Sequence, residues 1–118
     1  MSNMAEPMQQ ELANASAVLA RVRALFDASV LALAQRCQEG GRLDAKRLDE
    51  QQVASFEMAW AGAELLAAET TIAALTPASD SLDARLALVF AVDAVVALLD
   101  RLDVLLAETG QEPAAVDA

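Results

Sequence analysis

The sequence predicts an all-α fold, an antiparallel three-helix unit whose helices run up, down and up. Hydrophobic residues make up 56% of the chain but aromatic residues only 3%, so the apolar content is mainly Ala, Leu and Val, a mixture that favours helices. Four Gly and three Pro are too few turn-formers for a sandwich or barrel of short strands. Apolar residues also recur every three or four positions in three long segments. At 118 residues the chain is expected to form one domain.

The first helix is predicted at about residues 8–38, after a flexible N-terminus at residues 1–7. Pro7 suits the first turn of a helix, where its missing N–H costs nothing. Gly40-Gly41 is expected to end the helix as a left-handed C-terminal cap. The predicted apolar seam of this helix consists of Leu12, Ala15, Leu19, Val22, Phe26, Ser29 and Leu33.

The second helix is predicted at about residues 50–75. Asp44 can cap a brief turn before it, and Asp49 with Gln52 forms a pair that resembles a capping box. One continuous helix from Ala45 is the alternative. The helix is expected to end before Pro77, because the residue that precedes a proline is pushed out of the α region.

This second helix carries the clearest helical period and two apolar stripes. The first stripe consists of Val53, Phe56, Trp60, Ala63, Ala67 and Thr70, and the second of Met58, Leu65 and Ile72. Two apolar faces on one helix imply a neighbour on each side. We expect the stripe that holds Trp60 to pack inside the chain and the second stripe to make an outward contact.

The third helix is predicted at about residues 82–108, capped by Ser79, Asp80 or Ser81 and stopped at Gly110. Residues 110–118 are expected to be disordered. The predicted seam of the helix consists of Leu88, Val92, Val95, Leu99, Leu102 and Leu106. Large apolar residues also lie outside that seam. Two neighbouring helices cannot cover the whole surface, so the surplus predicts a further partner helix or a second copy of the chain.

Self-association or docking on a helical partner protein is therefore the predicted mode of action. Asp93 interrupts the apolar surplus, as a solvated residue or as a polar register device paired with Arg85 or Arg101 of a neighbour. The predicted interface residues are Met58, Leu65, Ile72, Leu86, Val89, Phe90, Asp93 and Val96.

Composition also predicts several absences. The net charge of −10 repels phosphate backbones and anionic headgroups, so neither a nucleic acid nor a membrane is expected as a partner. There is no His and only Cys37, so no imidazole metal site, disulfide or cofactor is expected. No secretion signal is evident, and the longest apolar run, residues 86–99, is short of the ~20 residues of a spanning helix. We expect a cytoplasmic protein.

Two charged features are candidates for chemistry. Glu57 and Glu64 lie two turns apart on one helix face, about 10 Å, which is too far to share a proton, so a solvated or intersubunit role is expected. Arg42, Lys46 and Arg47 form a basic cluster that is a candidate phosphate site. Local ion pairing is the favoured interpretation of that cluster, with three acids that lie among or beside the bases: Asp44, Asp49 and Glu50. Enzyme activity by this chain alone is not expected.

Residues 41–69, GRLDAKRLDEQQVASFEMAWAGAELLAAE, resemble the C-terminal helical domain of bacterial acyl-CoA dehydrogenase-like flavoproteins. The likeness extends more weakly into residues 83–95. In that family the domain is a four-helix bundle that builds the tetramer and lies against the flavin. This chain has no room for the family's other two domains, and no residue matches the catalytic Glu by motif. The resemblance implies a detached helical domain or a small accessory subunit.

Three functions follow from these observations. A non-catalytic interaction or assembly module is the first, and an accessory subunit of an acyl-CoA dehydrogenase-like enzyme is the second. The third is a binder of a small apolar or acyl ligand in the space between helices.

Overall fold

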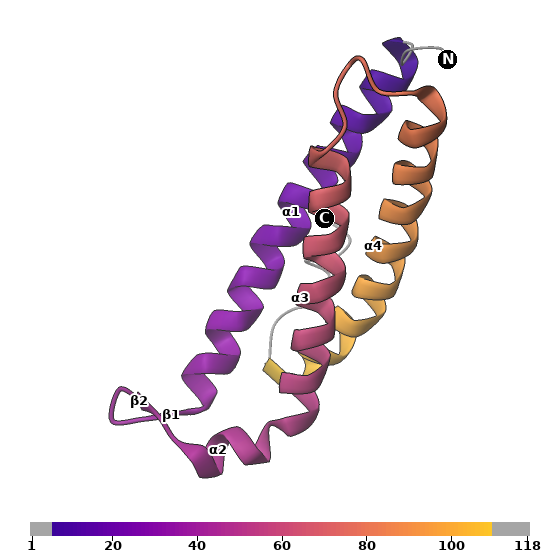
Figure 1. Ribbon diagram of the computed structural model, residues 1–118. Helices are drawn as coiled ribbons and strands as arrows, with labels where there is room; N and C mark the ends of the chain where they lie inside the picture. The colour runs from indigo at the N-terminus through magenta and orange to yellow at the C-terminus, as the bar shows by residue number, and fades with distance from the viewer. Residues whose placement is uncertain (1–5, 110–118) are drawn as a thin grey trace.

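Three long helices form a rod of 57 × 25 × 21 Å in the computed structural model, which describes residues 6–109 (Figure 1). Helices α1 (Glu6–Arg36) and α4 (Ser81–Thr109) run in the same direction, and α3 (Gln52–Ala73) runs antiparallel to both. The most extensive contact is between α3 and α4, and α1 packs against both. The predicted all-α, up-down-up fold is confirmed.

The predicted ends of the chain are only partly described. Residues 6 and 7 belong to α1, so the flexible N-terminus predicted at 1–7 is wrong for these two positions. Pro7 lies in the first turn of α1, where its ring is tolerated. Residues 1–5 and the tail predicted at 110–118 lie outside the described part of the chain.

A small hairpin replaces the predicted glycine cap. Strands β1 (Gln38–Glu39) and β2 (Arg42–Leu43) pair antiparallel, and Gly40-Gly41 forms the two-residue loop between them. Both glycines have positive φ, 61° and 79°, as a type I′ hairpin turn requires. Helix α1 has already ended at Arg36. The glycine pair was correctly predicted to be left-handed, but it turns a hairpin and does not cap a helix.

The short helix α2 (Ala45–Glu50) joins the hairpin to α3. Asp44 caps it, because its carboxylate accepts a hydrogen bond of 3.1 Å from the backbone N–H of Arg47. The chain bends at Gln51, so α2 and α3 are separate helices. Gln52 donates to Asp49 at 3.0 Å, as in the predicted pair, but the N-cap position of α3 is Gln51.

Asp80 is the cap of α4 among the three predicted candidates. Its Oδ1 accepts a hydrogen bond of 2.9 Å from the backbone N–H of Leu82. In the preceding loop, the backbone N–H of Thr76 donates to Ser79 Oγ at 2.9 Å. These bonds fix the turn that returns the chain from α3 to α4.

The core side of α1 is the predicted one. Its buried residues are Leu12, Leu19, Val22, Phe26, Ser29 and Leu33, with Ala15 half-buried between them. Ser29 is satisfied inside the core because its hydroxyl donates to the carbonyl of Leu25 at 3.0 Å. The ring of Phe26 packs on Gly62 of α3, where a Cβ would lie 3.1 Å from Phe26 Cζ.

Alanine dominates the contact between α3 and α4. The residues that α3 buries are Ala54, Met58, Ala61, Leu65, Ala68 and Ile72, and those that α4 buries are Ala84, Ala87, Ala91, Ala94, Leu98 and Leu102. On α3 a small residue alternates with a large one at heptad spacing. Small residues at such a contact let the two helix axes approach closely.

The inner and outer stripes of α3 are the reverse of those predicted. Phe56 and Trp60 are 60% and 49% exposed, whereas Leu65 is 1% exposed. Met58 and Ile72 are buried as well. The expectation that the stripe of Met58, Leu65 and Ile72 faces outward is therefore wrong. The physical reason is that α4 lies close to α3, so the space between the two helices holds alanine side chains but not an indole ring.

The buried side of α4 also differs from the predicted seam. Val92 is exposed, and Leu88, Val95 and Leu99 are only half-buried. Leu102 alone of the seam is fully buried, and the Leu106 side chain lies outside the described residues. The alanines of α4 face α3, so the larger aliphatic residues are turned toward α1 and toward the outside.

Candidate functional site

The candidate site is the outer face of α4, defined by Leu82, Leu86, Val89, Val92, Asp93 and Val96. Its five aliphatic side chains are each between 56% and 60% exposed over four helical turns. Leu82, Leu86, Val89, Asp93 and Val96 follow the 4-3-4-3 spacing of a heptad seam. Helix α4 therefore has one seam that packs in the core and a second seam, on the opposite side, that no described residue covers.

Five of the eight predicted interface residues are accessible at or beside this face. Leu86, Val89, Phe90, Asp93 and Val96 are exposed. Phe90 lies at the margin toward the end of α3, where it shares a surface hollow with Thr71. Met58, Leu65 and Ile72 belong to the core of the chain and are not available for an outside contact. The prediction missed Leu82 and Val92. The heptad spacing that leads from Leu82 through Leu86 to Val89 was the signal that would have found Leu82.

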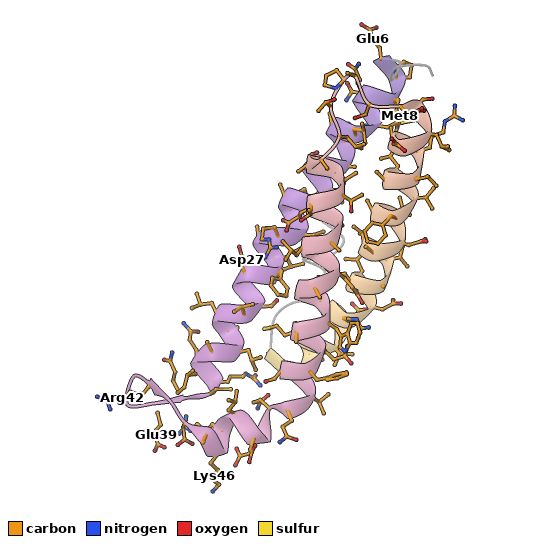
Figure 2. All side chains as sticks on the ribbon, in the orientation of Figure 1. Glu6, Met8, Asp27, Glu39, Arg42 and Lys46 are labelled. Carbon is orange, nitrogen blue, oxygen red and sulfur yellow. The ribbon has the colours of Figure 1, made fainter. Side chains whose placement is uncertain are left out.

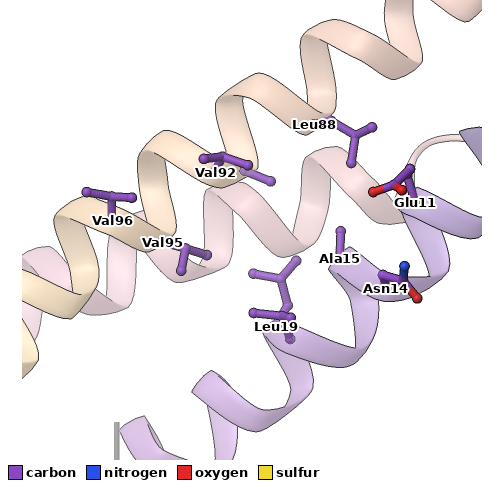
Figure 3. A pocket seen from close by; sticks show the side chains of 10 residues that line it. Glu11, Asn14, Ala15, Leu19, Leu88, Val92, Val95 and Val96 are labelled. Atoms are coloured by element: carbon purple, nitrogen blue, oxygen red, sulfur yellow. The ribbon is translucent and has the colours of Figure 1, made fainter. Parts of the chain in front are cut away.

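A groove of about 260 Å³ runs along one margin of the outer face, between α1 and α4 (Figure 3). Leu88, Val92, Val95 and Val96 line it from α4, and Glu11 and Asn14 of α1 supply polar atoms on the opposite side. Its remaining lining residues are Ala15, Val18, Leu19 and Ala91. The groove extends the apolar surface of α4 onto α1.

Two charged residues lie at the outer face of α4, Asp93 within it and Arg85 beside it. Among the described residues neither Arg85 nor Asp93 has an ion-pair partner, and both side chains are exposed. They are eight residues apart, which is about 12 Å along a helix, too far to pair with each other. Each is therefore available to a group on another molecule.

Arg101, near the end of α4, is occupied within the chain. Its Nη1 lies 2.8 Å from Glu57 Oε2, and its Nε lies 2.9 Å from Glu64 Oε1. Its guanidinium also covers the ring of Trp60, 5.3 Å from the ring centroid. The hydrogen bonds to Glu57 and then Glu64 raise the pKa of Arg101. Glu57 and Glu64 thus bridge two helices of one chain, and the solvated or intersubunit role expected for them is wrong.

Arg23 forms the corresponding link between α1 and α3. Its guanidinium binds both carboxylate oxygens of Glu69, with an Nε–Oε2 distance of 3.0 Å, and this hydrogen bonding lowers the pKa of Glu69 and raises that of Arg23. All three acids of α3 are therefore bound to arginines of neighbouring helices. The outer face of α3, defined by Val53, Phe56, Trp60, Ala63 and Leu66, has no charged member.

The basic cluster lies at the hairpin end of the molecule. Arg42 and Lys46 extend away from the helices (Figure 2). Arg47 Nη1 donates to the carbonyl oxygen of Gln38 at 2.7 Å, which ties α2 to β1. In the described part of the chain none of these bases forms the salt bridges predicted with Asp44, Asp49 and Glu50. Arg47 therefore has a structural role, whereas the Arg42 and Lys46 side chains extend into solvent.

Among the side chains that the structure describes, no three His, Cys, Asp or Glu are grouped so that they could hold a metal ion. No helix in that range combines the length and apolarity that crossing a bilayer requires. Comparison of the chain with protein-family models and with curated proteins gives no match. The resemblance to acyl-CoA dehydrogenase-like flavoproteins stays a prediction from the sequence.

Proposed function

We propose that this chain is a non-catalytic helical assembly module that binds another helix through the outer face of α4. The observation that carries the proposal is the uncovered heptad seam of Leu82, Leu86, Val89 and Val96. Complete burial of an aliphatic side chain of this size stabilises a structure by about 1.5–3 kcal/mol. A partner helix would recover part of that free energy at each position.

The paired acids support a non-catalytic role. A carboxylate acts in acid–base catalysis when burial or a second acid moves its pKa toward neutrality. Glu57, Glu64 and Glu69 instead bind arginines, and the pKa of Glu69 is lowered by its partner. These three acids therefore link helices within the chain.

Sedimentation velocity of the purified chain and two variants tests this proposal. The wild-type chain is expected to sediment as a dimer or larger assembly at micromolar concentration. Leu86→Gln/Val89→Gln/Val96→Gln should sediment as a monomer, because polar side chains replace the apolar seam of α4. The variant should stay folded, because glutamine favours a helix. The matched control, Val53→Gln/Phe56→Gln on the outer face of α3, should sediment as the wild type does. Assembly that survives the α4 substitutions would contradict the proposal.

Recovery of the chain from its native source tests for a different partner. The resemblance implies that this partner is a helical flavoprotein of the acyl-CoA dehydrogenase type. A yellow complex that the α4 variant no longer forms would identify it.

An apolar ligand site in the groove between α1 and α4 is the second candidate. Its volume of about 260 Å³ and its lining of Leu88, Val92, Val95 and Val96 favour a short aliphatic chain. Decanoate should then raise the melting temperature of the wild-type chain but not that of Val95→Gln. Equal shifts in the two proteins would exclude this site.

A further inference from the structure

We infer that the helix covering the outer face of α4 is α4 of a second copy of the chain, running antiparallel about a two-fold axis at Val89. This inference rests on the proposed function and names its partner. The α4 helices of the two copies would lie side by side, each on the side of its own bundle that faces away from α3. Four helical turns of each copy would take part.

In the antiparallel register, each aliphatic side chain of the outer face lies opposite an aliphatic side chain of the second copy. With the axis at Val89, that residue faces its own copy. Leu86 then faces Val92 of the second copy, and Leu82 faces Val96. Each layer combines side chains that are 56–60% exposed in the single chain, so every exposed aliphatic residue of the face gains an apolar neighbour.

The same register gives an ion-pair partner to each of the two charged residues, Arg85 and Asp93. Arg85 and Asp93 are equally distant from Val89 along the helix, on its two sides. Asp93 of each copy therefore lies at the level of Arg85 of the other, and two ion pairs form per dimer. Neither residue has a partner among the described residues of its own chain. A parallel pair would instead place Asp93 against Asp93 and Arg85 against Arg85, which costs free energy.

Two further acids of α4, Asp100 and Asp103, also favour the antiparallel pair. The helical overlap runs from Ser81, the first residue of α4, to Ala97, which is the residue opposite Ser81 about this axis. Asp100 and Asp103 lie beyond that overlap, so no α4 residue of the second copy lies opposite them. A parallel pair would set each of them against its own copy, in a chain whose net charge is already −10.

The area is sufficient for a specific contact. Five aliphatic side chains at about 60% exposure, together with Phe90, Arg85 and Asp93, can bury at most roughly 600 Å² per copy, or about 1,200 Å² in total, the lower bound for a specific dimer. We therefore expect a reversible dimer at micromolar protein concentration.

A charge exchange tests the register by sedimentation equilibrium. Asp93→Arg and Arg85→Asp should each weaken the dimer about tenfold, because each sets like charges against one another. The double variant Arg85→Asp/Asp93→Arg should return the dissociation constant to within about threefold of the wild type, since the pairs reform with opposite sign. A double variant that dimerises no better than the two single variants overturns the inference.

Cysteine cross-linking gives a second, geometric test. In a Cys37→Ala background, Val89→Cys should form a disulfide-linked dimer on mild oxidation, because the two-fold axis places this residue beside itself. Leu86→Cys should not, because it faces Val92 of the second copy. Equal cross-linking at both positions indicates a parallel pair and overturns the inference.

These results separate the two proposals. A dimer that the α4 substitutions dissolve, but that fails the charge exchange, leaves the assembly module standing and removes the antiparallel register. An assembly that the α4 substitutions do not change removes both.

Discussion

The inner and outer faces of α3 both carry apolar residues every three or four positions but have opposite surroundings. The inner face alternates alanine with a larger residue, as at Ala61 and Leu65, and is almost completely buried. The outer face carries Phe56 and Trp60, the largest side chains of the helix, and about half of each is exposed. In this helix pair, burial follows the fit between two closely spaced helices and not the size of the apolar side chain.

The largest expected difference between the faces is at two adjacent leucines. Leu65 is 1% exposed and Leu66 is 60% exposed. Leu65→Ala should lower the free energy of unfolding by about 3 kcal/mol, because it leaves a cavity between α3 and α4. Leu66→Ala should change it by less than about 0.5 kcal/mol. Urea unfolding at one fixed protein concentration, followed by circular dichroism, measures both, and equal losses would show that the faces are not distinct.

Two alanines of the same helix test the closeness of α3 and α4. Ala61 is fully buried, whereas Ala63 is exposed. Ala61→Leu should cost about 1–3 kcal/mol, because the added side chain forces the two helices apart. Ala63→Leu is the matched control and should be close to neutral. If the leucine at position 61 proved as harmless as that at position 63, the tight contact described here would be contradicted.

The arginine links between helices should have a smaller and pH-dependent effect. Glu69→Gln removes one partner of Arg23 and should cost at most about 1 kcal/mol at pH 7, because both side chains are partly exposed. Arg23 lowers the pKa of folded Glu69, so its stabilisation is complete above the pKa of the unfolded chain. The stabilisation is lost as pH falls through the folded pKa.

The difference in unfolding free energy between wild type and Glu69→Gln should therefore be constant from pH 7 to about 5 and shrink below about pH 4. Glu50→Gln, at an exposed position of α2, controls for a general charge effect. A difference that grows in acid would reverse the assigned sign.

The smallest expected effect concerns the outer face of α3. Arg101 covers one side of Trp60, the only Trp in the chain. Arg101→Met should remove the guanidinium that covers one face of the ring and make Trp60 fluorescence more easily quenched by acrylamide. Acrylamide is the quencher to use because it is neutral and is not repelled by Glu57 and Glu64. Arg21→Met on α1 should leave quenching unchanged. Identical quenching in the two variants would show that Arg101 does not shield the indole.

Periodicity in the sequence was sufficient to predict the helices, their order and the buried seam of α1. It was not sufficient to orient α3 and α4, because both helices have apolar residues on opposite sides. Large residues were expected inside, and this placed Trp60 in the core and Leu65 outside. The contacts of Glu57, Glu64 and Glu69 join residues between 37 and 46 positions apart in the sequence. Such long-range pairs follow from the packing angle of the helices, which no local pattern contains.

Part of the candidate site on α4 was also predicted from the sequence. Leu86, Val89, Phe90 and Val96 were recognised as surplus apolar residues, and this reasoning needed only the limited coverage that two neighbours provide. Arg101 was considered as a partner for Asp93 of a neighbour, but it is already bound to Glu57 and Glu64. Arg85, the other candidate, is the one that the structure leaves available.

The buried thiol of Cys37 gives the chain an internal reporter of local opening. The side chain is 1% exposed, where α1 meets the hairpin, and its sulfur lies 4.0 Å from the carbonyl oxygen of Arg47. An alkylating reagent can reach the sulfur only when the hairpin or α2 lifts away. The rate of alkylation therefore measures how often this end of the rod opens while the α3–α4 contact stays closed.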